Sequence, residues 1–225
     1  MTPARSSRAR ILRAAEQSFA EHGFRRVTVR HICRAARVNV AAVNYHFGDK
    51  LGLYQEVMEA AIDAMRAATD EARKAGDGKP AEQRLRGFLA VMVGRLLAAG
   101  RGPVHRLVHR ELNDPTPALD RLVEHGVRPR VEYLSRLVAE ILGCAVGDER
   151  VRRCVFSIQS QTLAAVPNPI AERLGFHPRP ADAAAIADHI ARFSLSGIRG
   201  LGRRPARPLA RGRRGRRRLA RTAGA

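Results

Sequence analysis

The chain has 225 residues, of which 45% are hydrophobic and 28% charged, and this ordinary globular composition excludes wholesale disorder. It contains no run of about 18 uncharged apolar residues, which excludes a membrane span, and no apolar stretch follows the polar first ten residues, so we expect a soluble cytoplasmic protein without a secretory signal. The formal net charge of +20 predicts a polyanionic partner, either nucleic acid or an anionic membrane surface.

Apolar residues recur with a helical period along almost the whole chain, and no stretch alternates as a β-strand does. In the first predicted helix Ile11 and Phe19 share one face. Thr28 and Asn39 are suitable N-cap residues for a short second and a short third helix. All three helices fall within the first 50 residues, which hold 10 basic and 3 acidic residues.

A long amphipathic helix is predicted after the Gly48-Asp49 break, and the segment from Gly76 to Pro80 is the clearest linker in the chain. Further helices are expected, in chain order, from Leu85 to Leu97 and at about 104–112, 116–142 with a break at Arg128-Pro129, 148–166 and 182–198. The sequence therefore predicts an all-α protein of about nine helices.

The tail, residues 199–225, holds 11 arginines and no acidic residue, whereas residues 51–198 are nearly balanced, with 20 basic and 18 acidic residues. Like charges repel and almost nothing in the tail can form a core, so we expect it to be disordered. Three roles stay open for it: a non-specific DNA-binding arm, a solubilising or interaction tail, or a membrane-surface patch. The last is disfavoured because the tail lacks an apolar face that would anchor it.

Catalytic and metal-binding patterns are weak. Cys33, Cys144 and Cys154 are scattered without metal-ligand spacing, and we expect reduced thiols of which at least two are buried, Cys33 among them. His105 and His109 are four residues apart but have no third ligand nearby, so no metal or other cofactor is expected. Because no nucleophile elbow, phosphate-binding loop or dinucleotide fingerprint is present, we do not expect an enzyme.

The basic first region has the organisation of a DNA-reading unit. The stretch Ala35 to Asn39 between the second and third helices has the length of a helix-turn-helix corner. The following segment, 38–47, would be the recognition helix: small side chains near its start allow close entry into the major groove, and Asn44 suits bidentate pairing with adenine. Val38, Val43 and Phe47 would point to the protein core instead.

Residues 28–54 closely resemble the helix-turn-helix of the TetR family, and the run Tyr45-His46-Phe47-x-x-Lys50-x-x-Leu53 is highly specific to it. The run Ala41-Ala42-Val43-Asn44-Tyr45-His46-Phe47 is most similar to the CecR-type branch, as is the segment His109-Arg110-Glu111-Leu112-x-Asp114-Pro115-Thr116. The resemblance is strong over about 8–65, fair over 80–198 and absent from the tail. It implies a DNA-binding domain over 5–65, with the helix-turn-helix at about 28–48, a helical ligand-binding and dimerisation domain over 80–198, and a separate tail over 199–225.

The resemblance also implies roles for single residues. It assigns phosphate contacts to Thr28, Tyr45, His46 and Lys50, a base or phosphate contact to Arg30, and base contacts to Val40, Ala41, Ala42 and Asn44. Arg37 departs from the family, which usually has glycine in the turn. If that position needs a positive φ, the arginine costs about 1 kcal/mol there.

In the second domain the resemblance places a ligand pocket beside the helix at about 104–112. There His109 or Arg110 would contact an anionic effector, although both could equally be surface or satisfied interior groups. The helices at 148–166 and 182–198 would pair with their two-fold mates in a four-helix interface. The apolar contributors expected for that interface are Ile158, Ile186, Ile190 and Phe193, with the alternative that some of them face the core of their own subunit.

The sequence thus predicts a ligand-responsive transcriptional regulator, a repressor that binds a pseudo-palindromic DNA operator as a homodimer and is released by a small-molecule effector. Its partners would be double-stranded DNA, a second copy of the chain and the effector, without a membrane. The alternative is a non-specific architectural protein that coats DNA and is dominated by its arginine-rich tail.

Overall fold

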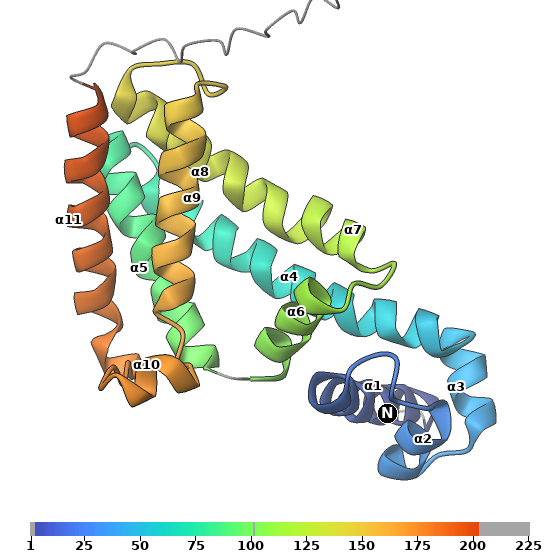
Figure 1. Ribbon diagram of the computed structural model, residues 1–225. Helices are drawn as coiled ribbons and strands as arrows, with labels where there is room; N and C mark the ends of the chain where they lie inside the picture. The colour runs from blue at the N-terminus through green and yellow to red at the C-terminus, as the bar shows by residue number, and fades with distance from the viewer. Residues whose placement is uncertain (1–2, 101, 203–225) are drawn as a thin grey trace, which may run out of the picture.

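The computed structural model of the protein describes residues 3–100 and 102–202, within which all regular structure is helical (Figure 1). The first four helices are α1 (Pro3–His22), α2 (Val29–Ala36), α3 (Val40–Phe47) and α4 (Lys50–Gly76). They are followed by α5 (Ala81–Ala99), α6 (Pro103–Asn113), α7 (Leu119–Arg121), the π-helical turn η1 (Leu122–Val127), α8 (Arg128–Leu142), α9 (Glu149–Ala164), α10 (Pro169–Arg173), the 3-10 turn η2 (Pro180–Asp182) and α11 (Ala183–Gly202). The all-α prediction is confirmed.

Helices α1 to α3 and the start of α4 enclose an N-terminal core. Ile11 and Phe19 of α1 are fully buried in it, together with Val43 from α3, while Phe47 is nearly so. Thr28 caps α2, as predicted, since its Oγ1 accepts a hydrogen bond of 3.2 Å from the backbone N–H of His31. Asn39 caps α3 and Asp49 caps α4 in the same way, so three caps and the buried faces of these helices fix the helix-turn-helix.

Helix α4 belongs to two cores. Its first half, including Leu53 and Met58, packs into the N-terminal core, and its second half places Ala68 and Ala72 in a second core. The predicted domain boundary at residue 65 therefore falls inside a continuous helix. The linker predicted at 76–80 is a tight turn that reverses the chain into α5.

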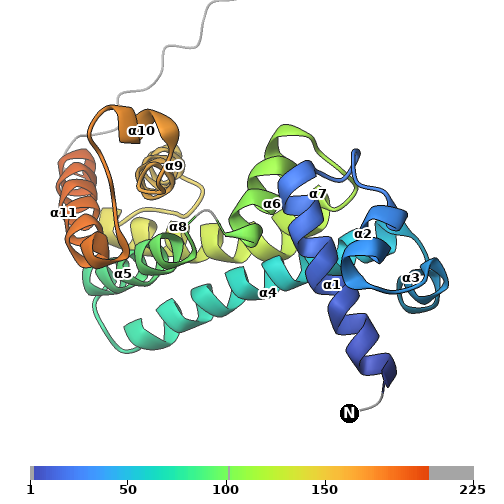
Figure 2. The same cartoon turned by 90° about the horizontal axis from the view of Figure 1, so that it is seen from below.

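The second core lies among α4, α5, α8, α9 and α11, which form the larger lobe seen in Figures 1 and 2. The stripe predicted between Leu85 and Leu97 supplies most of the α5 face of this core. The same figures place α9 and α11 side by side at the end of the molecule farthest from α3. The smaller helix-turn-helix lobe thus sits at one end of a long, shared α4.

The break predicted at Arg128-Pro129 takes the form of η1. Proline has no N–H to donate into the preceding turn, and a π-helical turn ends where α8 begins. Within η1, Gly126 is buried against α4: a Cβ added there would lie 3.2 Å from the Sδ atom of Met65. Glycine at this position therefore lets η1 approach α4 closely.

Two features differ from the sequence-based expectation. The short helix α10 has no apolar stripe of its own, so periodicity did not predict it. Helix α11 continues to Gly202, four residues into the segment predicted to be a disordered tail, because Ile198 is buried and Arg199 forms an ion pair with Glu82 of α5. The rest of that tail, 203–225, lies outside the described residues.

Among the described residues no single helix has the length and apolar character of a membrane span. Helices α5 and α6 reach that composition only when they are counted together across a bend of 99°.

The turn of the helix-turn-helix holds Arg37 at φ 52° and ψ 54°, the left-handed conformation that favours glycine. We expect Arg37→Gly to raise the free energy of unfolding by about 1 kcal/mol, because glycine adopts this conformation without a Cβ clash. Chemical denaturation of both proteins measures the difference.

The matched control is Arg37→Ala, which removes the charged side chain but keeps the strained Cβ. Its stability should stay within about 0.5 kcal/mol of the wild type, as for other surface substitutions. Equal stability of the glycine variant and the wild type would contradict the assignment of strain to this turn.

Candidate DNA interface and ligand cavity

Helix α3 presents one exposed face. Val40, Ala41 and Asn44 are exposed, and the side chain of Tyr45 is 83% exposed. Ala42, predicted to face the bases with them, is half-buried and packs against the N-terminal core. The exposed face thus combines small residues near the helix start with an amide and a phenol about one turn later, which suits contact with a groove and its phosphates.

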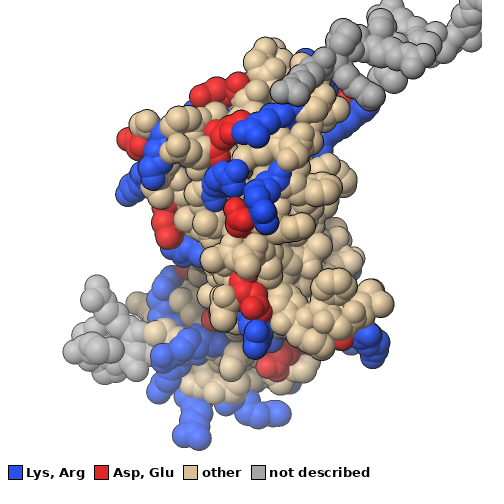
Figure 3. Space-filling view, turned by 90° about the vertical axis from the view of Figure 1, so that its left-hand side faces the viewer, with Lys and Arg blue, Asp and Glu red and all other residues tan. Residues whose placement is uncertain are grey.

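The surface around α2 and α3 is cationic. Arg30, Arg34 and Arg37 are exposed, and within the described part of the chain none of them forms an ion pair. Figure 3 shows Lys and Arg side chains gathered at the lower end of the molecule, where the helix-turn-helix lobe lies, whereas acidic side chains alternate with them over the upper lobe. Arginines without an ion-pair partner among the described residues, placed beside the exposed face of α3, are suited to contact the phosphates of a DNA backbone.

Thr28 and His46 hold positions at the edges of this face. The Thr28 hydroxyl oxygen is engaged by the cap of α2, but the side chain is exposed and its O–H is still able to donate to a phosphate. The His46 Nε2 atom lies 3.1 Å from the Ser7 hydroxyl of α1, a hydrogen bond that joins the start of α1 to α3. Arg8, one residue further along α1, pairs with Glu56 of α4 at 2.7 Å.

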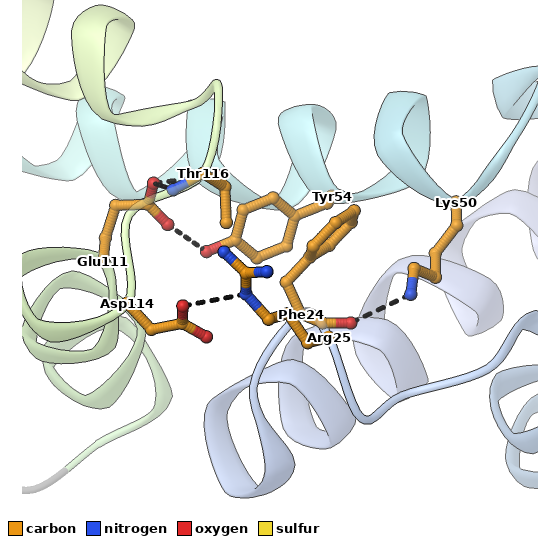
Figure 4. Close-up of polar contacts among 7 residues, drawn as sticks. All are labelled: Phe24, Arg25, Lys50, Tyr54, Glu111, Asp114 and Thr116. Carbon is orange, nitrogen blue, oxygen red and sulfur yellow. Dashed lines mark hydrogen bonds and ion pairs between the residues drawn. The ribbon is translucent and has the colours of Figure 1, made fainter.

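Lys50 has a structural contact that sequence reasoning missed. Its ammonium donates hydrogen bonds of 3.0 Å to the backbone carbonyls of Phe24 and Val27, and it lies 4.4 Å from the centroid of the Phe24 ring (Figure 4). Lys50 therefore ties the start of α4 to the loop that leads into α2. The two partners are more than twenty residues away in sequence, so no local pattern could have revealed them.

The second lobe meets the helix-turn-helix through a buried carboxylate. Glu111 of α6 is fully buried, and its carboxylate accepts hydrogen bonds from the Tyr54 hydroxyl of α4 at 2.6 Å and from the backbone N–H and hydroxyl of Thr116 at 2.7 and 2.8 Å (Figure 4). Burial raises the pKa of Tyr54, and the hydrogen bond to Glu111 raises it further. The phenol therefore stays protonated and donates to Glu111.

Two further contacts cross the same junction. Arg25 pairs with Asp114 at 2.9 Å (Figure 4). The Arg110 guanidinium donates to the last carbonyls of α1, to Ala20 at 2.9 Å and also to Glu21. The segment from His109 to Thr116, noted above only as a resemblance, therefore contacts the helix-turn-helix lobe through the end of α6 and the residues that follow it.

A cavity of about 1190 Å³ opens next to this junction, large enough for a drug-sized molecule. Its walls are the turn after α1, helix α6, the end of α5, and the connection from α9 to α10, with Tyr54 and Met65 of α4 and Arg130 of α8 completing it. His109 and Arg110, the predicted effector contacts, both line it. Arg110 is also held by α1, and the His109 ring lies 3.2 Å from the Asn113 amide nitrogen.

The described residues contain no group of three or more His, Cys, Asp or Glu placed to hold a metal ion. Cys33 and Cys154 are buried free thiols, as predicted for at least two cysteines, and Cys144 is half-buried. Burial raises the pKa of both Cys33 and Cys154, which disfavours the reactive thiolate.

Comparison with known proteins agrees with this geometry. A model of the bacterial regulatory proteins of the TetR family matches residues 11–57, and a model of the C-terminal domain of the HTH-type transcriptional dual regulator CecR matches residues 81–198. The CecR protein of Shigella flexneri is 27% identical over 163 residues, which cover 68% of this chain and 73% of that protein.

Solved structures share the fold. A TetR-like transcriptional regulator from Rhodococcus sp. RHA1 is 16% identical with a TM-score of 0.63, covering 88% of this chain and 100% of that one. The SmeT–triclosan complex is 19% identical with a TM-score of 0.59, covering 85% and 90% of the two chains. The chain belongs to the TetR family of transcriptional regulators, in the branch represented by CecR, and its N-terminal lobe is that family's DNA-binding helix-turn-helix.

Proposed function

We propose that the protein is a cytoplasmic repressor that binds a pseudo-palindromic operator as a homodimer and releases it when a small molecule enters the cavity beside α6. One observation carries the ligand response: the cavity wall and the junction between the lobes are built from the same residues. Those shared by both are Arg25, Tyr54, Arg110, Asp114 and Thr116. A relative of the same fold, SmeT, is known as a complex with triclosan, which supports a small molecule as the effector.

The coupling follows from differential binding. A ligand shifts an equilibrium only as far as it prefers one state over the other. Because the cavity is bounded on one side by the turn after α1 and on the other by α6, a ligand that widens it separates two surfaces joined by Arg110 and Arg25. We infer that such a ligand favours a different placement of the helix-turn-helix, and hence a recognition-helix spacing that no longer fits the operator.

On the DNA, we propose base contacts from the exposed residues Val40, Ala41 and Asn44, with Ala42 closer to the core. Thr28 and Tyr45 would donate to phosphates, with His46 in support, and Arg30 would reach a base or a phosphate. Lys50 has a third N–H beyond the two donated to carbonyls, which leaves one donor for a phosphate.

The first prediction from the proposed function concerns sequence readout. After an operator is selected from a random duplex pool with the wild-type protein, Asn44→Ala should relax discrimination at one base pair in each half-site, at a cost of about 1–3 kcal/mol there. Titration of duplexes with single substitutions measures this loss, and Gln83→Ala, an exposed amide of α5, is the matched control with an unchanged profile.

The same titrations test the function itself. A wild-type complex with the operator should survive an excess of random DNA. If random DNA removes it completely, or if Asn44→Ala leaves every base preference unchanged, the proposed sequence reader is wrong, and the first of these results favours the DNA-coating alternative.

For the dimer, α9 and α11 carry a large exposed apolar surface at the end of the molecule away from α3. Phe156 of α9 is 75% exposed and Phe193 of α11 is 64% exposed. Of the interface residues predicted from sequence, only Phe193 lies on this surface. Ile158 and Ile190 are buried in the second core of the same subunit, and Ile186 is half-buried against it. They lie on the helix faces that pack into this core, so they are not available to a second subunit.

The prediction for assembly uses Phe193→Glu. A charge placed at the centre of a buried interface is costly, so light scattering at micromolar concentration should give a dimer for the wild type and a monomer for this variant, with unchanged helicity. Val123→Glu in η1, at an exposed apolar position elsewhere, should remain dimeric. A monomeric wild type would contradict the dimer and, with it, the palindromic operator.

A third prediction tests the junction. Tyr54→Phe removes the phenol that donates to the buried Glu111, and leaving a buried carboxylate oxygen without its donor should lower the free energy of unfolding by about 1–3 kcal/mol. Chemical denaturation measures the loss. Tyr133→Phe is the control, since that hydroxyl forms no hydrogen bond within the described part of the chain, and it should change stability little. Equal losses for the two variants would show that the junction bond contributes nothing specific.

A further inference from the structure

Arg130, in the first turn of α8, lines the cavity. Its Nε atom is buried and has no hydrogen-bond partner, and within residues 3–100 and 102–202 its guanidinium forms no ion pair. Burial alone lowers the pKa of this arginine, with no carboxylate opposing the shift. Removing a charged group from water costs folding free energy unless a partner compensates for the lost hydration. A bound anion would be such a partner for Arg130.

The cavity as a whole carries an excess of positive charge. Among the described residues that line it, the arginines are Arg25, Arg26, Arg106, Arg110 and Arg130, and the only carboxylate is that of Asp114. Asp114 already pairs with Arg25. The cavity is therefore complementary to an anion.

Much of the remaining wall is apolar. Leu96 comes from the end of α5, Val104 and Val108 from α6, and Leu163 and Val166 from the end of α9 and the residues after it. A wall of this kind favours an apolar ligand body, whose removal from water stabilises the complex in proportion to the buried area.

We propose that the cavity binds an amphipathic carboxylic acid, in which the carboxylate pairs with the Arg130 guanidinium and the apolar body lies against α6 and the end of α9. A planar guanidinium matches a carboxylate with two parallel hydrogen bonds, which would satisfy the buried Nε–H. This inference rests on the proposed effector cavity and not on the DNA contacts.

The other cavity arginines with known contacts are less suited to this role. Arg25 is neutralised by Asp114, and Arg110 already donates to two carbonyls of α1. The proposal places the anion at Arg130 of α8, whereas the sequence-based prediction places it at His109 or Arg110. Both of those residues line the same cavity.

The test is calorimetric titration of the full-length protein, without DNA, with decanoate and with its neutral counterpart decanol. Decanoate should bind at one site per chain and at least tenfold more tightly than decanol. Arg130→Met should weaken decanoate at least tenfold and leave decanol within twofold, whereas Arg130→Lys, which keeps the charge but loses the planar fork, should fall between the two. A parallel titration with 2-naphthoate shows whether a chain or a ring is preferred as the apolar body.

Arg136→Met is the matched control, because Arg136 is an exposed arginine of the same helix and pairs with Glu132. It should bind decanoate as the wild type does. Arg130→Met replaces a half-buried guanidinium, which forms no ion pair among the described residues, with an apolar group. Its melting temperature without ligand should therefore be at least that of the wild type, so that lost binding is not lost folding.

The inference is overturned if neither acid binds the wild type, if decanol binds as tightly as decanoate, or if Arg130→Met binds the acids within twofold of the wild type. Because the titrations contain no DNA, these outcomes are separate from a failure of operator binding. A protein that binds decanoate through Arg130 but keeps its operator would retain the site and contradict only the proposed release.

Discussion

The buried carboxylate of Glu111 is the interaction on which the arrangement of the two lobes depends. It comes from α6, accepts the phenol of Tyr54 from α4, and receives two hydrogen bonds from Thr116 at the start of the next segment. A buried carboxylate is stable only where its hydrogen-bond donors are in place. The bond to Tyr54 therefore fixes the position of α6 along α4. The orientation of α6 in turn places Arg110 against the end of α1.

The ring of Phe24 connects Tyr54 to the loop that leads into the helix-turn-helix. Phe24, in the loop between α1 and α2, packs against Tyr54 with 4.9 Å between ring centroids and lies beneath the Lys50 ammonium. Tyr54 and Lys50 are one helical turn apart on α4, so the same face of that helix holds both the junction and the loop that begins α2. Packed groups therefore connect the cavity residue Tyr54 to the loop that leads into α2.

Local patterns predicted the helices because the period of the apolar residues, the cap residues and the helix-breaking residues all lie within a few residues of one another. Thr28 and Asn39 cap the helices that their positions suggested. The groups that were missed act across the fold: the carbonyls bound by Lys50, the phenol bound by Glu111, and the burial of Arg130 depend on segments far apart in the chain. For the same reason apolar spacing alone did not separate Ile190, which serves the core, from Phe193, which faces outward.

The cavity and the junction impose opposite requirements on stability. Glu111 is satisfied by three hydrogen bonds within the chain, so the junction is complete without a ligand. The buried Nε atom of half-buried Arg130 has no such partner among the described residues, and its removal from water costs folding free energy that an entering anion would recover. In the proposed regulator, the contacts between the lobes form without a ligand. An anionic ligand would supply the hydrogen-bond partner that the Arg130 Nε atom lacks among the described residues. Binding free energy is then available to loosen the contacts of Arg110 and Arg25, which line the same cavity, and this is the step that would convert occupancy into release of DNA.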